Sequence, residues 1–186
     1  MRTLFATCCS LEPLVAAHAG EMFLVLSDPA IYEFENAPPP DEQWLRARYE
    51  RLEQRGPGSA TETWLNWVVR FRSGDLVGYV QATVRQEGIS LVACELNSQY
   101  WRQGIATAAL QAMLRELANH YAVRTFVAVL KAKNYRSAGL LRKLGFVPAS
   151  NDLLLKYRDA PDELVMLRAR SKQFAPATRL SRRGES

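Results

Sequence analysis

A polar loop with one glycine connects a predicted strand to a predicted helix and has the composition of an anion-binding site. The strand covers residues 89–96, and the helix starts after Gly104. The free backbone N–H groups and the dipole of a helix N-terminus attract negative charge, phosphate in particular. Gly104 and Ala106 allow the backbone to approach phosphate oxygens, and Arg102 can add a charge-assisted hydrogen bond. The alternative is an ordinary strand-to-helix loop in which the glycine serves tight packing.

The loop differs from two familiar phosphate-binding motifs. A Walker A loop has Lys directly after its last glycine, whereas Ile105 follows Gly104 here. The GxGxxG dinucleotide fingerprint lies within a parallel strand–helix–strand unit, but this loop follows a run of predicted antiparallel hairpins. Both motifs are therefore disfavoured.

A second segment able to bind a ligand is the helix predicted over residues 134–144. Strands 89–96 and 123–130 lead to the two helices, and we expect these strands to be neighbours. If they splay apart, each leaves backbone groups that an extended ligand with amide groups can satisfy. Asn134, at the start of the helix, can hydrogen-bond to such a ligand or can simply cap the helix.

The hydrophobic pattern places both segments in an α+β fold with a mixed sheet. The first third is helical after one strand, three antiparallel strands follow, and helices and strands then alternate. The expected strands cover residues 3–8, 63–71, 76–85, 89–96, 123–130, a segment from 146 and 164–170. The expected helices cover residues 13–26, a short segment after Pro29, a segment capped by Asp41 that ends before Gly56, 105–120 and 134–144, the last closed by Gly145.

Length and charge indicate one folded domain with a basic end. The chain has 186 residues, which suits a single domain, predicted here over 1–170. The net charge of +5 is compatible with an anionic partner, but three of these charges belong to the segment 171–186, which we predict to be a mobile tail. We therefore do not expect nucleic-acid binding of consequence.

The sequence also predicts a cytoplasmic protein. No apolar run is long enough for a signal peptide or a membrane span. The three cysteines, Cys8, Cys9 and Cys94, lack CxxC spacing, so we expect reduced thiols packed as small apolar residues and no metal site.

Two segments together resemble the GNAT superfamily of acetyl-coenzyme A dependent N-acetyltransferases, specifically its RimJ/RimL-like branch. They are ELNSQYWRQGIATAAL, from residue 95, and NYRSAGLLRKLGF, from residue 134. Earlier phrases, LSDPAIYEF, PPP before a helix and WVVRFRSGDLVGYVQA, are also similar to those of the branch. The resemblance covers about residues 1–170. It implies a single-domain, mostly antiparallel mixed sheet flanked by helices, with a V-shaped splay between two central strands.

The resemblance also implies a set of cofactor-binding residues. The pyrophosphate of coenzyme A would lie on the loop that precedes the helix, and the pantetheine arm along the end of the preceding strand. Ser137 would lie near the thiol and is a candidate catalytic residue. The implied cofactor-binding residues are Leu96, Asn97, Arg102, Gln103, Gly104, Ile105, Ala106, Thr107, Asn134 and Ser137. The sequence departs from the family at Arg102, where Gly is frequent, and at Leu141, where many members have a Tyr that protonates the leaving thiolate.

Glu95 is the candidate general base. An alkyl amine, with a pKa near about 10, must lose a proton before it attacks a thioester. Glu95 is the only acid in the strand 89–96 and lies between Cys94 and Leu96, where a buried charge without a role is costly. The alternative is an exposed carboxylate at the strand end, or one paired with an arginine.

The histidines and the aromatic residues indicate a functional site less clearly. We expect His18 and His120 to be structural. The aromatic residues Trp44, Tyr49, Trp64 and Trp67 are candidates for an acceptor cleft, although core packing is the more common use of such side chains.

The sequence thus predicts transfer of acetyl from acetyl-coenzyme A to a primary amine by direct attack in a ternary complex. The predicted acceptors are a protein N-terminal α-amine or a small-molecule amine, and the protein is expected to be a monomer or homodimer. The alternative function is an acyl-coenzyme A sensor without turnover, which Leu141 and Arg102 motivate.

Overall fold

Eight strands of the described residues form one sheet with helices on both faces. The structure, a computed structural model, describes residues 1–34, 36–56 and 61–170, so the predicted tail lies outside the described residues. The strands are β1 (Leu4–Phe5), β2 (Cys9–Pro13), β3 (Glu62–Phe71), β4 (Leu76–Arg85), β5 (Ile89–Leu96), β6 (Thr125–Lys131), β7 (Val147–Pro148) and β8 (Glu163–Ala169). The α-helices are α1 (Ala19–Leu26), α2 (Glu42–Glu53), α3 (Ile105–His120), α4 (Tyr135–Lys143) and α5 (Asn151–Tyr157), with short 3-10 helices η1 (Ala16–His18), η2 (Pro29–Tyr32) and η3 (Ser98–Tyr100).

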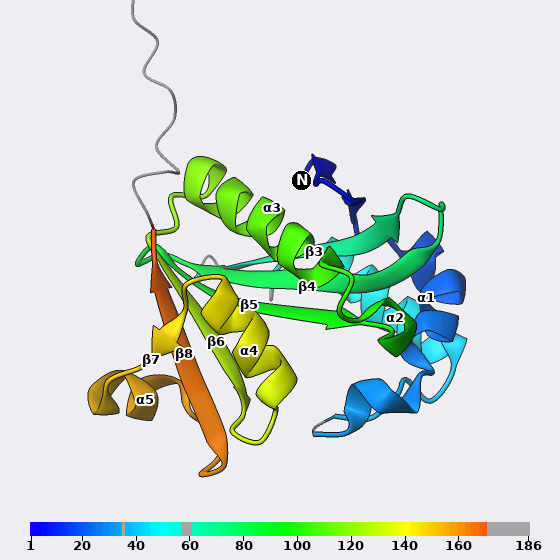
Figure 1. Cartoon of the computed structure of the whole chain (residues 1–186). Helices are drawn as coiled ribbons and strands as arrows, with labels where there is room; N and C mark the ends of the chain where they lie inside the picture. The colour runs from blue at the N-terminus through cyan, green and yellow to red at the C-terminus, as the bar shows by residue number, and fades with distance from the viewer. Residues whose placement is uncertain (35, 57–60, 171–186) are drawn as a thin grey trace, which may run out of the picture.

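The sheet has the order β1-β2-β3-β4-β5-β6-β8-β7 and opens between two central strands. All its described pairs are antiparallel except β5 with β6, which run parallel. Their pairing joins only Ile89–Leu91 to Thr125–Val127, although both strands continue further. Beyond this point β5 and β6 diverge (Figure 1), and this divergence confirms the predicted V-shaped splay.

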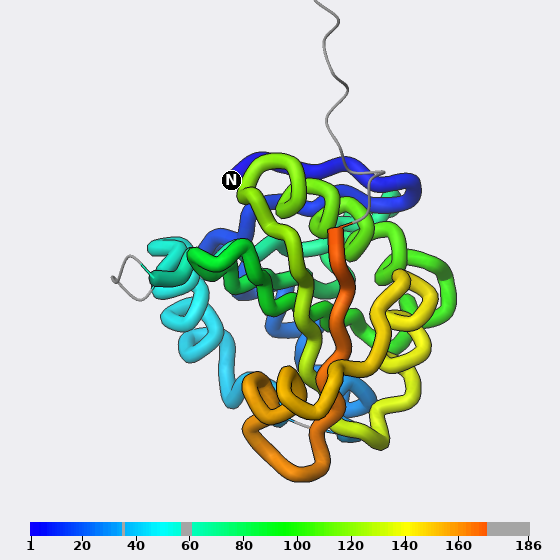
Figure 2. Tube along the Cα trace, turned by 90° about the vertical axis from the view of Figure 1, so that its left-hand side faces the viewer, coloured from blue at the N-terminus to red at the C-terminus, as the bar shows by residue number. Residues whose placement is uncertain are grey.

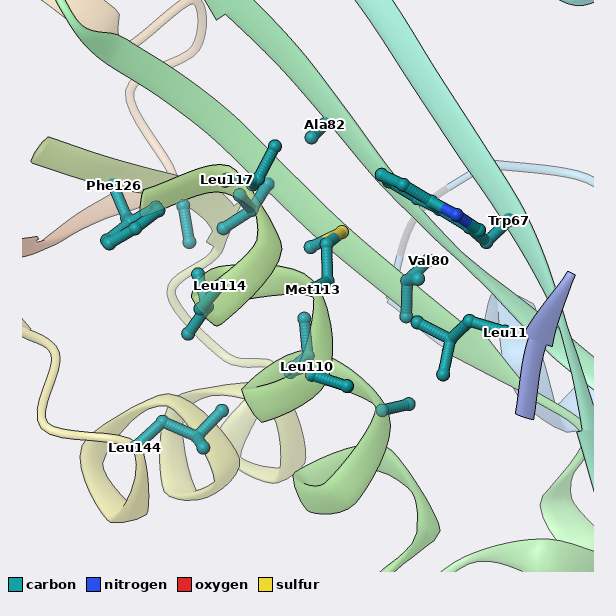
Figure 3. Close-up of a cluster of buried hydrophobic side chains, with 14 of the residues drawn as sticks. Leu11, Trp67, Val80, Ala82, Leu110, Met113, Leu114, Leu117, Phe126 and Leu144 are labelled. Carbon is teal, nitrogen blue, oxygen red and sulfur yellow. The ribbon is translucent and has the colours of Figure 1, made fainter. Parts of the chain in front are cut away.

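The helices divide between the two faces of the sheet. Helix α3 packs its Leu110, Met113 and Leu117 against a face that includes Trp67 and Val80 (Figure 3). Helices α1 and α2 cover the opposite face in a separate hydrophobic cluster. Figure 2 shows α2, in cyan, and α4, in yellow, on opposite sides of β6 and β8. The alternation of side chains along each strand supplies both clusters.

Capping residues fix the helices that matter for the site. The Asp41 side chain accepts a 2.7 Å hydrogen bond from the backbone N–H of Trp44 and starts α2 as predicted. Gly145 has a φ of 82° after α4, which confirms the predicted left-handed cap.

The N-terminal segment and the region after β7 differ from the sequence expectations. The predicted first strand is a hairpin of β1 and β2, and Pro13 pairs with Trp67 at the end of β2 instead of starting a helix. The expected helix therefore begins only with η1 and α1. Helix α5 was not expected, because its seven residues are too few to give a clear helical period.

Candidate functional site

The opening between β5 and β6 is part of a cleft of about 490 Å³. It lies between the end of β5, the loop that leads to α3, the start of α4 and the segment at η2. Its lining residues are Ala30, Ile31, Phe34, Cys94, Glu95, Leu96, Tyr100, Trp101, Arg102, Gly104, Ile105, Ala106, Thr107, Asn134, Tyr135, Arg136, Ser137, Gly139, Leu140 and Lys143. We call this space the first cleft.

The N-terminus of α3 faces the first cleft with its backbone donors. Gly104 is the N-cap with a φ of 80°, and no side chain of the described residues caps the helix. A Cβ on Gly104 would meet no atom within 4 Å, so the glycine borders open space. The first-turn residues Ile105, Ala106 and Thr107 line the cleft, and their N–H groups are those that α-helical bonding leaves free. This end of the cleft fits a phosphate group.

Cationic side chains add positive charge to the first cleft. Arg102, Arg136 and Lys143 all line the first cleft. Arg102 has a φ of 60°, a left-handed conformation that only glycine adopts without strain. This backbone explains why glycine is frequent at the matching position of the family that the sequence resembles.

The end of β5 offers backbone groups to the first cleft. The N–H of Asn97 donates to the carbonyl of Val77 at 2.9 Å, so alternate residues of β5 bond to β4. Leu96 is the residue between two that bond to β4, so its N–H and C=O point away from β4. They point toward the side of β5 where β6 pairs earlier in the strand and has diverged at this position. Its carbonyl accepts a 2.8 Å hydrogen bond from the indole N–H of Trp101. The Leu96 N–H is therefore available to a ligand that lies along β5.

Side chains that follow η2 contact side chains of α4 beside the first cleft. Arg136 forms an ion pair with Glu33, and its guanidinium lies over the rings of Phe34 and Trp101. The rings of Phe34 and Tyr135 meet edge to face with centroids 5.9 Å apart. We call these five residues the clasp.

Glu95 lies where the first cleft meets a second one. Its Oε2 accepts a 3.2 Å hydrogen bond from the hydroxyl of Tyr79, the residue paired with it on β4. Burial, and after it the charge of Glu95, raises the pKa of Tyr79 well above its usual value. The same two causes, in the same order, raise the pKa of Tyr32 to about 12. Both phenols thus stay protonated near neutral pH, and Tyr79 remains a hydrogen-bond donor to the carboxylate.

The second cleft, of about 330 Å³, lies between α2, the η2 region and the sheet face that α2 covers. Asn66 and Gln81, a cross-strand pair of β3 and β4, contribute polar side chains to it. Its lining residues are Leu14, Leu26, Tyr32, Asn36, Ala37, Pro39, Trp44, Leu45, Arg48, Tyr49, Leu52, Asn66, Tyr79, Gln81 and Glu95. Glu95 lines both clefts, so this residue borders two separate binding spaces.

Comparison with known families decides which chemistry these two clefts belong to. A family profile described as "Acetyltransferase (GNAT) domain" matches residues 10–147. The chain belongs to the GNAT acetyltransferase family. This match confirms the predicted family and fold class and identifies an acetyltransferase enzyme. No curated protein matched the sequence in a separate search.

Solved GNAT structures share the fold at low sequence identity. RimJ of Mycobacterium smegmatis, in complex with CoA-disulfide, has a TM-score of 0.75 and 17% identity over 90% of this chain and 87% of that one. The ribosomal alpha-N-protein acetyltransferase RimL, in complex with coenzyme A, has a TM-score of 0.72 and 16% identity over 88% and 95%. A microcin self-immunity acetyltransferase, MccE, in complex with acetyl-CoA and AMP, has a TM-score of 0.73 and 14% identity over 88% and 93%. RimJ and RimL are thus among the neighbours, in agreement with the branch that the motifs indicate.

The GNAT fold brings together most of the residues singled out in the sequence. Those that line the first cleft are Glu95, Leu96, Arg102, Gly104, Ile105, Ala106, Thr107, Asn134 and Ser137. Asn97 and Gln103 do not line it. Asn97 caps η3 by accepting from the N–H of Gln99 and donates to the carbonyl of Val25, and Gln103 donates to the carbonyl of Gln99. Cofactor contacts of these two residues stay a prediction.

Helix α4 holds its two candidate residues by a cap. The Asn134 Oδ1 accepts a 3.0 Å hydrogen bond from the N–H of Ser137, so Asn134 does cap the helix while it lines the cleft. Leu141 is buried in the hydrophobic core.

Several lining residues were not found by sequence reasoning. Tyr79 pairs with Glu95 across β4 and β5, and only the register of the predicted strands could have indicated it. Arg48 lies one helical turn after Trp44, on the same side of α2. Of the four aromatic candidates, Trp44 and Tyr49 line the second cleft, whereas Trp67 is fully buried under α3. Trp64 lines a different pocket.

The remaining polar candidates have structural contacts. His18 accepts a hydrogen bond from the N–H of Val15, and His120 contacts Arg2 and Glu116. The three cysteines are free thiols. Across the described ranges, no three His, Cys, Asp or Glu side chains gather as metal ligands do. In the same ranges, no helix combines the length and apolar character needed to cross a bilayer.

Proposed function

We propose that this GNAT enzyme transfers acetyl from acetyl-coenzyme A to a primary amine by direct attack in a ternary complex. The observation that carries the proposal is the position of Glu95, which lines both the first and the second cleft. Two binding spaces that share one carboxylate suit two substrates that react beside a base. The proposed acceptor is a protein N-terminal α-amine or a small-molecule amine.

The first cleft takes acetyl-coenzyme A, which supplies the thioester acetyl group. The N–H groups at the start of α3 bind its pyrophosphate, and Arg102 and Lys143 add charge-assisted contacts. Leu96 presents its free N–H to the extended arm of the molecule in the opening between β5 and β6. Asn134 and Ser137 contact the same arm from the side of α4.

Glu95 removes a proton from the amine, directly or through water. The hydrogen bond from Tyr79 orients the carboxylate of Glu95, which lines the cleft proposed for the acceptor. The N–H of Leu96 donates to the acetyl carbonyl oxygen as negative charge develops there, in a cleft that the substrates close to water. Ser137 donates a hydrogen bond to the leaving thiolate, which with a thiol pKa of about 8.5 is a tolerable leaving group.

A panel of amines tests this function. The purified protein is incubated with acetyl-coenzyme A and with peptides or small amines, while free thiol is followed. We expect acceptor-dependent thiol release together with acetylated amine in the mass spectrum. Tight binding of acetyl-coenzyme A without any acceptor-dependent release would contradict the proposal and support a sensor without turnover.

The cofactor assignment has its own test. Gly104→Glu places bulk and negative charge where the pyrophosphate is proposed to bind, and the left-handed backbone there disfavours any side chain. We expect a loss of acetyl-coenzyme A affinity by calorimetry. Gly74→Ala, at a left-handed glycine in the β3–β4 turn, is the control for backbone strain alone. Equal affinity in both variants would exclude this loop as the pyrophosphate site.

A further inference from the structure

The second cleft contains a buried hydroxyl group that lacks a partner. Tyr49 is only 3% exposed, and its hydroxyl has no hydrogen-bond partner among the described residues. Buried hydroxyl groups are almost always hydrogen-bonded, and an unsatisfied one destabilises the folded chain. Because Tyr49 lines the second cleft, a ligand that reaches this hydroxyl can supply the missing acceptor atom.

A cationic side chain stands at the entrance of the same cleft. Arg48 is exposed, and its guanidinium lies over the ring of Trp44, 5.7 Å from the centroid. No carboxylate of the described residues forms an ion pair with Arg48, whereas Arg46, on the same helix, is bonded to Glu42 at 2.8 Å. The guanidinium N–H groups of Arg48 can therefore donate hydrogen bonds to a ligand.

Side chains of opposite charge line the second cleft with Tyr79. Glu95 lies against the Tyr79 hydroxyl, and the same phenol also feels the positive charge of Arg48, which opposes the rise of its pKa. The charge of Arg48 also opposes the rise that burial causes in the pKa of Tyr49. The second cleft is therefore lined both by a carboxylate, that of Glu95, which also lines the first cleft, and by a guanidinium, that of Arg48 on α2.

We propose that the second cleft selects a primary amine that carries an anionic group, with the amine at Glu95, the anion at Arg48 and an oxygen of the same ligand accepting from Tyr49. This inference rests on the proposed function and specifies its acceptor. The volume of about 330 Å³ admits either a small amino acid or the first residues of a peptide. The shared chemistry is an amine and an anion within one short segment.

Matched acceptor pairs test the charge preference and distinguish the two sources. The small-molecule pair is γ-aminobutyrate and its neutral amide, and the peptide pair is Ser-Glu-Ala-amide and Ser-Gln-Ala-amide. We expect kcat/KM for the anionic member to exceed that of the neutral member by about 10-fold or more in at least one pair, as for a hydrogen bond to a charged group. The pair that responds identifies the source of the acceptor.

Variants of Arg48 assign the preference to this side chain. Arg48→Gln removes the preference, and Arg48→Glu reverses it in favour of a cationic acceptor such as Ser-Lys-Ala-amide. Arg46→Gln is the matched control, because it removes one charge from the same helix away from the cleft. If Arg48→Gln prefers the anionic acceptor over the neutral one as strongly as the Arg46→Gln control does, the inference is overturned. So does acetylation of neutral or cationic amines alone, whereas acetylation of no amine at all contradicts the proposed function itself.

Tyr49→Phe separates ligand binding from a structural role. The variant loses only the hydroxyl, so a group that serves the ligand gives a raised acceptor KM and an unchanged or higher melting temperature. The KM of acetyl-coenzyme A is expected to stay unchanged, because Tyr49 does not line the first cleft. A lowered melting temperature with an unchanged acceptor KM would show that the hydroxyl is structural and would remove it from the acceptor site.

Discussion

Gly78 is the residue that allows β4 and β5 to approach each other beside Glu95. A Cβ at this position would overlap the carbonyl oxygen of Glu95 and would lie 2.8 Å from the Leu96 Cα. The register of β3 and β4 also shifts next to it, after Val69. A glycine at this irregularity therefore fixes the carboxylate and the backbone N–H that the proposed chemistry uses.

Gly78→Ala is expected to destabilise the protein and to reduce its activity. The added methyl group must push β4 and β5 apart, which costs about 1–3 kcal/mol of unfolding free energy by analogy with overpacked cores. Gly74→Ala, where a Cβ meets no atom within 4 Å, is the control. Urea unfolding and acetyl transfer are measured for both. A Gly78→Ala variant as stable and as active as the control would contradict the close approach.

Arg102 combines a left-handed backbone with a charge beside the proposed pyrophosphate site. In Arg102→Gly, relief of backbone strain offsets the larger entropy of the unfolded glycine, so unfolding free energy should change by less than about 1 kcal/mol. Loss of the guanidinium should weaken acetyl-coenzyme A binding roughly tenfold in calorimetry. Unchanged affinity would show that Arg102 points to solvent.

At the scale of elements, the clasp connects η2 to α4 beside the first cleft. Its ion pair between Glu33 and Arg136 is exposed to solvent and is therefore screened by salt. In Glu33→Gln, we expect acetyl-coenzyme A to bind and dissociate faster in stopped-flow experiments, with little change in thermal stability. High salt should reproduce this effect in the unmodified protein. Rates that depend neither on Glu33 nor on salt would exclude the clasp as a barrier to entry.

The elements around the cofactor loop were predictable, because their signals are local. The strand at residues 89–96, the loop glycine and the helix after it agree with β5, Gly104 and α3. The hairpin of β3 and β4 also agrees, since turn residues separate two runs rich in β-branched and aromatic side chains.

The elements that were mispredicted depend on tertiary contacts. The apolar spacing after Pro13 imitates a helix, but pairing of Pro13 with Trp67 makes this segment the end of β2. The second cleft was only partly anticipated for the same reason. Arg48 and Tyr79 come together through the packing of α2 on the sheet, which no pattern along the chain reports.

At the scale of the whole molecule, three tyrosines that line the second cleft, Tyr32, Tyr49 and Tyr79, make stability sensitive to alkaline pH. Burial raises the pKa of Tyr32 to about 12 and also raises the pKa of Tyr49 and that of Tyr79 above the usual value. Because the unfolded phenols ionise near pH 10, the unfolded state binds fewer protons than the folded state above this pH. Unfolding free energy should therefore fall as pH rises from about 10 to 12.

Urea midpoints measured between pH 8 and 12 check this dependence. Tyr32→Phe should reduce the slope of the decline above pH 10, because one group with a raised pKa is removed. A midpoint that is constant over this range, or a slope that Tyr32→Phe does not alter, would contradict the raised phenol pKa values.

The two clefts and the splayed sheet form one arrangement with Glu95 at its centre. In the proposed function, helix α3 and the open end of β5 bind the acetyl donor, while α2 and the opposite sheet face bind the acceptor. The account therefore depends on the role of this carboxylate more than on any other residue.

The pH dependence of acetyl transfer by Glu95→Gln is the most direct measurement of that role. The account predicts that kcat/KM for the amine falls by about 10²-fold or more near pH 7 and recovers as pH approaches the pKa of the amine. The dissociation constant of acetyl-coenzyme A should stay within about twofold, since glutamine preserves the shape of the side chain. An unchanged rate and pH profile in Glu95→Gln, with acetyl-coenzyme A still bound, would contradict the account.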